Sequence, residues 1–272
     1  MGTVLRILAG LVIAYLVVLL LAWRYQERLA LPGARARLIP PAQAGMPDGE
    51  MVTVTAADGV RLSGWYLPAA QGGKAGLIWF YGNMENVSGL APVIRSLRPP
   101  DAALLILDYR GYGESDGTPS EHGLYLDADA AWTYLATRPE LDSARIAVYG
   151  RSVGTVPALY LATSHPVRAV VLESPFTSAA DMVRVHYPFL PRFVIRLSLN
   201  NRERARRLSA PLLVLHGDQD QIAPLWMGRA VAEAGHAREL VVIKGAGHNE
   251  TYNVGGAEYR RKLLAFLAQA LQ

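Results

Sequence analysis

The residue with the clearest chemical potential is Ser152, which lies in the pentapeptide GRSVG at residues 150–154. An apolar run at residues 146–149 predicts a β-strand directly before it, and the residues after it follow a helical pattern. A serine on a sharp strand-to-helix turn has its hydroxyl lifted off the sheet. Glycines two positions away on each side let strand and helix come close enough for that turn. The pattern therefore predicts Ser152 as a nucleophile, with an ordinary glycine-serine turn as the alternative.

A serine hydroxyl is a poor nucleophile until a base takes its proton, so a histidine is expected near Ser152. His248 follows the last expected strand in the glycine-rich stretch GAGHNE, where a loop can bring the imidazole over the serine. His216 also ends a strand, but it points into a turn and is expected to be a hydrogen-bonded loop residue. We predict His248 as the general base, chosen from the six histidines His122, His165, His186, His216, His236 and His248.

The histidine needs an acid to orient it, and with this type of nucleophile turn the acid falls between serine and histidine in the chain. Asp220 lies in the loop HGDQDQIAP, just after an expected strand, and has the reach to meet His248. Asp218 directly follows a glycine and is better explained as a turn or cap residue. Glu173, at the end of the preceding strand, is the rival acid. Asp108 precedes the serine in the chain and is expected to brace its own glycine-rich loop.

Acyl transfer at a serine also needs backbone N–H groups that hold the developing oxyanion without reorganising. One such N–H is expected on Val153, which follows the nucleophile at the start of a helix whose dipole adds to the effect. The other is expected in the loop YGNMEN at residues 81–86, where Asn83 comes just after the glycine. An ordinary strand-to-helix turn is the alternative for this loop.

Composition limits the remaining possibilities. The chain has 272 residues, which fits one large α/β domain or two small ones and is ample for a closed core. It contains no cysteine, which excludes disulfides, thiolate catalysis and cysteine-based zinc sites. The net charge of +4 comes from scattered arginines without a dense basic stripe, so we expect no nucleic-acid partner. We also expect neither a metal nor an organic cofactor.

Strand-like and helix-like segments alternate from residue 50 to residue 272. This rhythm predicts an α/β fold with an eight-stranded, mostly parallel sheet and helices on both faces. An antiparallel hairpin around Asp58-Gly59 precedes it, and residues 174–209 predict a small helical cover. The expected strands are 51–55, 60–67, 77–81, 103–107, 146–149, 169–172, 211–216 and 240–243. The expected helices are 86–97, 120–137, 226–234 and 257–271.

The N-terminal residues have the pattern of a membrane segment. Residues 7–23 carry no charge, and Trp23, Arg24 and Tyr25 follow as interfacial residues typically do. We predict an uncleaved transmembrane signal anchor in residues 1–25 and a linker in residues 26–49, with a cleaved signal peptide or a buried core helix as alternatives. More arginines follow the run than precede it, which favours a single-pass protein with the domain, residues 50–272, on the cytoplasmic side.

Several stretches together resemble a known family: YGNMEN, DYRGYGESDG, YGRSVG, ESPFTS, HGDQDQIAP and GAGHNETYNVGGAEY. In their order and spacing they are similar to the α/β-hydrolase superfamily and, within it, to the membrane-anchored Bem46-like group related to the ABHD-type hydrolases. The resemblance runs from about Glu50 to the C-terminus. It implies an α/β-hydrolase fold, a triad of Ser152, Asp220 and His248, and oxyanion donors at Asn83 and Val153.

One residue departs from the family pattern, because such relatives usually carry a histidine where this chain has Tyr81. That position supports a loop and is not part of the triad, so we expect altered loop packing with catalysis retained. The sequence predicts a membrane-tethered serine hydrolase acting on an acyl ester or a lipidated substrate, with ester or thioester bonds favoured. A serine peptidase of the prolyl or aminopeptidase kind and a non-catalytic membrane scaffold are the alternatives, and a fluorophosphonate probe separates the enzymes from the scaffold.

Overall fold

In the computed structural model, which describes residues 2–272, eight strands form one sheet in the order β1-β2-β4-β3-β5-β6-β7-β8. β1 and β2 form an antiparallel hairpin, and β2 also runs antiparallel to β4. All the other neighbouring strands pair in parallel. The strands are β1 Glu50–Thr55, β2 Arg61–Leu67, β3 Ala75–Phe80, β4 Ala102–Leu107, β5 Ile146–Arg151, β6 Ala169–Glu173, β7 Leu212–Gly217 and β8 Glu239–Ile243. The predicted eight-stranded, mostly parallel sheet is confirmed.

The core lies on the central parallel strands. Every residue of β3, β4, β6 and β7 is buried. Strands covered on both faces carry nearly continuous apolar runs, and these four strands have that composition. The parallel order also brings the carboxyl ends of β3, β5, β6, β7 and β8 to one edge of the sheet, where ligands bind in open α/β folds.

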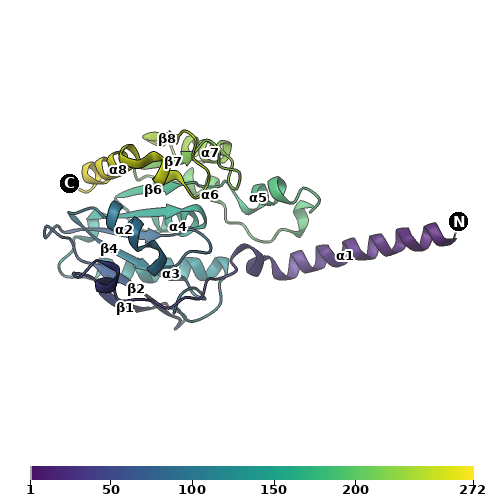
Figure 1. The fold of residues 1–272 in the computed structure, drawn as a ribbon, viewed down its shortest axis with the longest axis horizontal. Coiled ribbons are helices and arrows are strands. Elements are labelled where there is room, and N and C mark those ends of the chain that lie inside the picture. Colours follow the sequence, from purple (N-terminus) through teal and green to yellow (C-terminus); the bar gives the residue numbers. More distant parts are fainter. Residues whose placement is uncertain (1) are drawn as a thin grey trace.

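The helices pack in two groups (Figure 1). α2 packs against α8, whereas α3, α4, α6 and α7 pack against one another in succession. Ser120 is the N-cap of α3, as its sequence predicts, and its hydroxyl accepts a hydrogen bond from the Gly123 N–H at 3.0 Å. The bounds are α2 Ala91–Leu97, α3 Glu121–Ala136, α4 Thr155–Ser164, α6 Asn201–Ala205, α7 Leu225–Ala234 and α8 Thr251–Ala270.

A small cover connects β6 to β7, as expected from the break in the rhythm of the sequence. It contains α5 (Ala179–His186), the short helix η5 (Arg192–Val194) and α6. Phe176 and Leu199 from this cover form a second small core with Val156 of α4 and Met227 of α7. The cover therefore packs over the start of the helix that follows the nucleophile turn.

A long N-terminal helix, α1 (Gly2–Ala30), projects away from the domain (Figure 1). An 18-residue window of α1 has a mean hydropathy of 2.8, and none of that window is buried. Length and composition are therefore sufficient for crossing a membrane. The next residues lie against the domain, because Leu31, Leu38 and Met46 are buried in its core. The segment expected as a linker thus packs against the domain from residue 31 onward.

Candidate active site

The turn that carries Ser152 has the strained geometry expected from its sequence. β5 ends at Arg151, Ser152 adopts a φ of +50°, and a short helical turn leads into α4. A Cβ added at Gly150 or Gly154 would lie well inside contact distance of backbone atoms, of α4 and β3 respectively. Only glycine fits at both positions, so the two flanking glycines permit the close approach that lifts the serine off the sheet.

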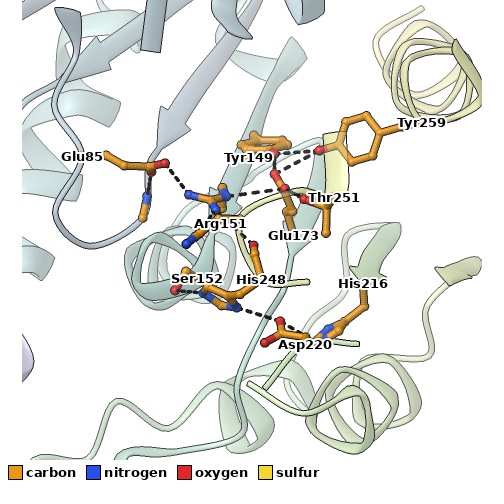
Figure 2. A network of polar contacts seen from close by, with 12 residues as sticks. Glu85, Tyr149, Arg151, Ser152, Glu173, His216, Asp220, His248, Thr251 and Tyr259 are labelled. Atoms are coloured by element: carbon orange, nitrogen blue, oxygen red, sulfur yellow. Dashed lines mark hydrogen bonds and ion pairs between the residues drawn. The ribbon is translucent and has the colours of Figure 1, made fainter. Parts of the chain in front are cut away.

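The structure brings the three predicted polar side chains into one hydrogen-bonded chain (Figure 2). His248 Nε2 lies 2.8 Å from Ser152 Oγ, and His248 Nδ1 lies 2.7 Å from Asp220 Oδ2. The histidine is 9% exposed and the aspartate 5%, so the contacts are shielded from solvent. The loops after β5, β7 and β8 supply the three residues, because parallel strands end at the same edge of the sheet.

Asp220 is held in place by its own loop. Its Oδ1 accepts backbone hydrogen bonds from Ile222 at 2.9 Å and Ala223 at 2.8 Å. Burial alone would raise its pKa, but hydrogen bonds from His216 and His248 and the charge of His248 outweigh it and hold the pKa well below the usual range. His216 is fully buried and lies 2.7 Å from the Ala223 carbonyl oxygen, the hydrogen-bonded role expected from its sequence.

The other candidate acids have different partners. Asp218 accepts a backbone hydrogen bond from Gly245 at 2.7 Å, as a turn residue does. Glu173 is buried and contacts the hydroxyls of Tyr149, Thr251 and Tyr259. Its carboxylate therefore ties β6 to β5 and α8, and no hydrogen bond joins it to His248 within residues 2–272.

Arg151, the residue before the serine, links these parts (Figure 2). It pairs with Glu85 and lies 3.5 Å from the Glu173 carboxylate. It also donates to the His248 carbonyl at 3.1 Å and to Asn249 Oδ1 at 2.8 Å. Burial would lower the pKa of the guanidinium, but the two carboxylates outweigh it and raise the pKa. Arg151 therefore fastens the histidine loop to the nucleophile turn, a role that sequence reasoning missed.

The two backbone N–H groups predicted as oxyanion donors lack an acceptor in the described residues. The Asn83 N–H has no hydrogen-bond acceptor within residues 2–272, and Val153, at the second position of its helical turn, has none inside that turn. The Asn83 side chain is fixed, since it donates to the Ala30 carbonyl at 2.9 Å and accepts from the Tyr112 hydroxyl at 2.6 Å. The loop that carries this N–H is therefore braced from two sides.

Tyr81 is a buried support for that loop. Its hydroxyl donates to Asp108 Oδ1 at 2.9 Å, and the same oxygen accepts from the Val87 N–H at 2.8 Å. Burial of Asp108 raises the pKa of its carboxyl to about 6, despite these hydrogen bonds. Asp108 thus braces the loop after β3, and its carboxylate lies so close to Gly113 of its own glycine-rich loop that a Cβ there would collide with it.

Comparison with known proteins agrees with this architecture. A model of the α/β hydrolase fold matches residues 77–197. The chain is 38% identical over 258 residues to an uncharacterised protein of Mycobacterium tuberculosis. That alignment covers 93% of this chain and 90% of the relative. It is 32% identical over 215 residues to alpha/beta hydrolase domain-containing protein 17B of Xenopus laevis. That alignment covers 78% of this chain and 73% of the relative.

Among solved structures, an esterase of Pyrococcus furiosus has a TM-score of 0.72 with 20% identity, covering 88% of this chain and 98% of that one. At this identity the likeness concerns the fold. The sequence relatives, by contrast, share 32–38% identity with this chain over most of its length, and this shows the family. This chain belongs to the α/β-hydrolase family and is related to its ABHD-type members, as its sequence motifs predict.

Proposed function

We propose that the protein is a membrane-anchored serine hydrolase that cleaves acyl ester or thioester bonds through an acyl-enzyme. The observation that carries the proposal is the hydrogen-bonded chain of Ser152, His248 and Asp220, with distances of 2.8 and 2.7 Å. A nucleophile, a base and an orienting acid in this arrangement catalyse acyl transfer in many proteins of unrelated fold. The family supports hydrolase chemistry, and the roles of the three side chains are our assignment.

In this mechanism Ser152 Oγ attacks the acyl carbon while His248 Nε2 takes its proton. Asp220 stays ionised, because its pKa is held low, and accepts the Nδ1–H, which fixes the tautomer that leaves Nε2 free. The N–H groups of Asn83 and Val153 stabilise the oxyanion. His248 then protonates the departing oxygen or sulfur. A water molecule, deprotonated by the same histidine, releases the acid and restores Ser152.

We assign the anchor to residues 1–25, of which residues 2–25 lie in α1, and the hydrolase domain to residues 50–272, with residues 26–49 between them. The arginines that follow the apolar run favour the cytoplasmic side for the domain. Exposed apolar side chains on the cover suit acyl chains, which is why we favour esters and thioesters over peptides.

The test is hydrolysis of acyl esters of graded chain length by the full chain in detergent, together with a matched pair of serine variants. Ser152→Ala is expected to lower kcat at least about a thousandfold. Ser164→Ala, at the exposed end of α4, removes the same hydroxyl away from the site and should have no effect. Undiminished hydrolysis by folded Ser152→Ala would exclude the proposed mechanism.

A further inference from the structure

The cover exposes large apolar side chains close to α1. We call residues 187–195 the cover segment. Three of its side chains, Tyr187, Phe189 and Phe193, are exposed, and Phe193 is the most exposed at 81%. A soluble surface rarely groups large apolar residues in this way without a partner. The identity of that partner follows from the contacts that the cover segment makes.

The cover segment and the two residues after it are attached to α1 at two levels. The Tyr15 hydroxyl donates to the Phe189 carbonyl at 2.6 Å. Eleven residues further along the helix, Gln26 Oε1 accepts from the backbone N–H groups of Arg196 at 2.7 Å and Leu197 at 2.8 Å. These two levels are about 16 Å apart along the helix axis. In Figure 1 the chain after α5 runs beside the domain-proximal part of α1.

These contacts fix a depth once α1 crosses a bilayer. Trp23 and the arginine after it mark the interface. Tyr15 lies eight residues deeper, about 12 Å along the axis of an untilted helix. The Phe189 carbonyl that it binds must lie at a similar depth. The geometry points to insertion of the cover segment into the leaflet nearest the domain, as a second and mostly irregular membrane element. This inference rests on the anchor proposed above.

The backbone of the cover segment has partners for part of its polar groups. Unpaired backbone groups are costly in hydrocarbon, so irregular chain is tolerated there only when its polar groups have partners. Pro188 and Pro191 carry no N–H. The N–H groups of Tyr187, Leu190, Val194 and Ile195 donate to carbonyls within the cover, at 2.7 to 3.0 Å. Those of Phe189, Arg192 and Phe193 have no acceptor in residues 2–272, so insertion requires water or lipid ester oxygens to follow the segment into the leaflet.

Basic side chains border the segment where headgroups would lie. Arg196 stacks over Trp23 with its guanidinium carbon 4.5 Å from the ring centroid, and it donates to the Trp23 carbonyl at 3.0 Å. Arg192 lies between the apolar residues of the segment and is long enough to extend its charge to the interface. Arginine beside tryptophan at this level suits an anionic lipid surface.

Insertion would bring the active site to the bilayer surface. Asn83, on the oxyanion loop, donates to the carbonyl of Ala30, the last residue of α1. His186, at the end of α5, lies 2.7 Å from the carbonyl of Ile222, two residues after Asp220. The oxyanion loop therefore contacts the anchor helix, and the Asp220 loop contacts the residue directly before the cover segment. The substrate class that follows is an acyl compound whose chain resides in the bilayer and reaches Ser152 from the lipid side.

The chain contains no cysteine, so a single introduced cysteine can carry a spin label without background. The experiment places labels at Phe193→Cys and Phe189→Cys in the full chain, in nanodiscs of phosphatidylcholine and phosphatidylglycerol. Ile13→Cys, exposed on α1, is the lipid reference, and Met51→Cys, exposed on β1, is the aqueous reference. Fluorophosphonate labelling of each variant shows that it is folded. The measurement is the ratio of collision rates with oxygen and with a nickel chelate.

The inference predicts that labels at 189 and 193 give ratios several-fold above that at 51 and close to that at 13. Labels at 189 and 193 that match the aqueous reference, while position 13 lies in lipid, would overturn insertion and leave the anchor standing. An aqueous label at position 13 would overturn both. The double variant Phe189→Ser/Phe193→Ser should lose most hydrolysis of long-chain esters in vesicles and keep that of short soluble esters; equal retention of both would also overturn the inference.

Discussion

Two buried carboxylates, Asp220 and Glu173, lie at the ends of neighbouring strands, and their partners separate their roles. Asp220 accepts from His248 and from two backbone N–H groups of its own loop. Glu173 faces three hydroxyl groups and the Arg151 guanidinium. The first arrangement orients an imidazole, and the second joins three elements of the fold.

Amide substitutions at these two positions test that division. Asp220→Asn is expected to lower kcat by about four orders of magnitude, because the amide no longer fixes the productive tautomer or balances the imidazolium. Glu173→Gln is expected to keep kcat near that of the wild type and to lower the unfolding midpoint. Ester kinetics and thermal unfolding on the same preparations measure both effects. A crippled Glu173→Gln beside a mild Asp220→Asn would reverse our assignment.

Asp108 predicts a pH dependence of stability. Burial raises its folded-state pKa to about 6, above the unfolded value, so the folded state retains a proton that the unfolded state loses. Stability from this group is full below about pH 4 and falls by roughly 3 kcal/mol as the pH rises through 6. Asp108→Asn should remove that fall. Urea unfolding at several pH values measures the slope, and equal slopes in both proteins would contradict the buried-carboxyl account.

At the scale of elements, the nucleophile turn depends on how closely β5, α4 and β3 approach one another. A Cβ at Gly154 would collide with backbone atoms of Phe80 and Tyr81. Gly154→Ala is therefore expected to lower the free energy of unfolding by about 3 kcal/mol or more, or to prevent folding. Gly89→Ala is the matched control, because its Cβ would meet only ordinary contacts beginning at 3.6 Å. Equal urea midpoints for the two variants would contradict the close-packed turn.

The sequence predicted the sheet well, because buried parallel strands carry long apolar runs that end in turn residues. It predicted the last helix less well. α8 begins at Thr251, and Gly256, with a φ of +49°, introduces a kink before the expected start at residue 257. Glycine and polar residues in that first part hide the helical pattern, and α8 packs on β7 all the same.

The part of the site missed from the sequence depends on contacts between distant loops. Arg151 meets Glu85 after β3, Glu173 at the end of β6 and Asn249 after β8. The spacing of residues along the chain does not predict contacts between loops that are far apart in the sequence. The one available signal was the charge of Arg151, which lies next to the nucleophile at the end of an apolar strand. The packing of residues 31–49 against the domain was not predicted from the sequence for a similar reason. Its proline and alanine content resembles a linker, while Leu38 and Met46 contact the core.

At the scale of the whole molecule, one exposed apolar helix and one packed domain predict a tethered enzyme. The full chain is expected to stay with membranes in alkaline carbonate, because an apolar helix of this length resists extraction. A chain that begins at Arg24 should be released while keeping ester hydrolysis. The truncation stops there because Gln26 and Leu31 contact the domain. Release of the intact protein by carbonate would contradict the anchor.

The central claim is that Ser152 is the nucleophile, and a covalent probe tests it most directly. The full chain is treated with a fluorophosphonate, digested with trypsin and analysed by mass spectrometry. Cleavage after Arg151 gives a peptide that begins at Ser152 and also contains Ser164, an internal control on the same fragment. We predict an adduct on Ser152, none on Ser164, and none on the corresponding peptide of Ser152→Ala. An unmodified Ser152 in folded protein would contradict the account.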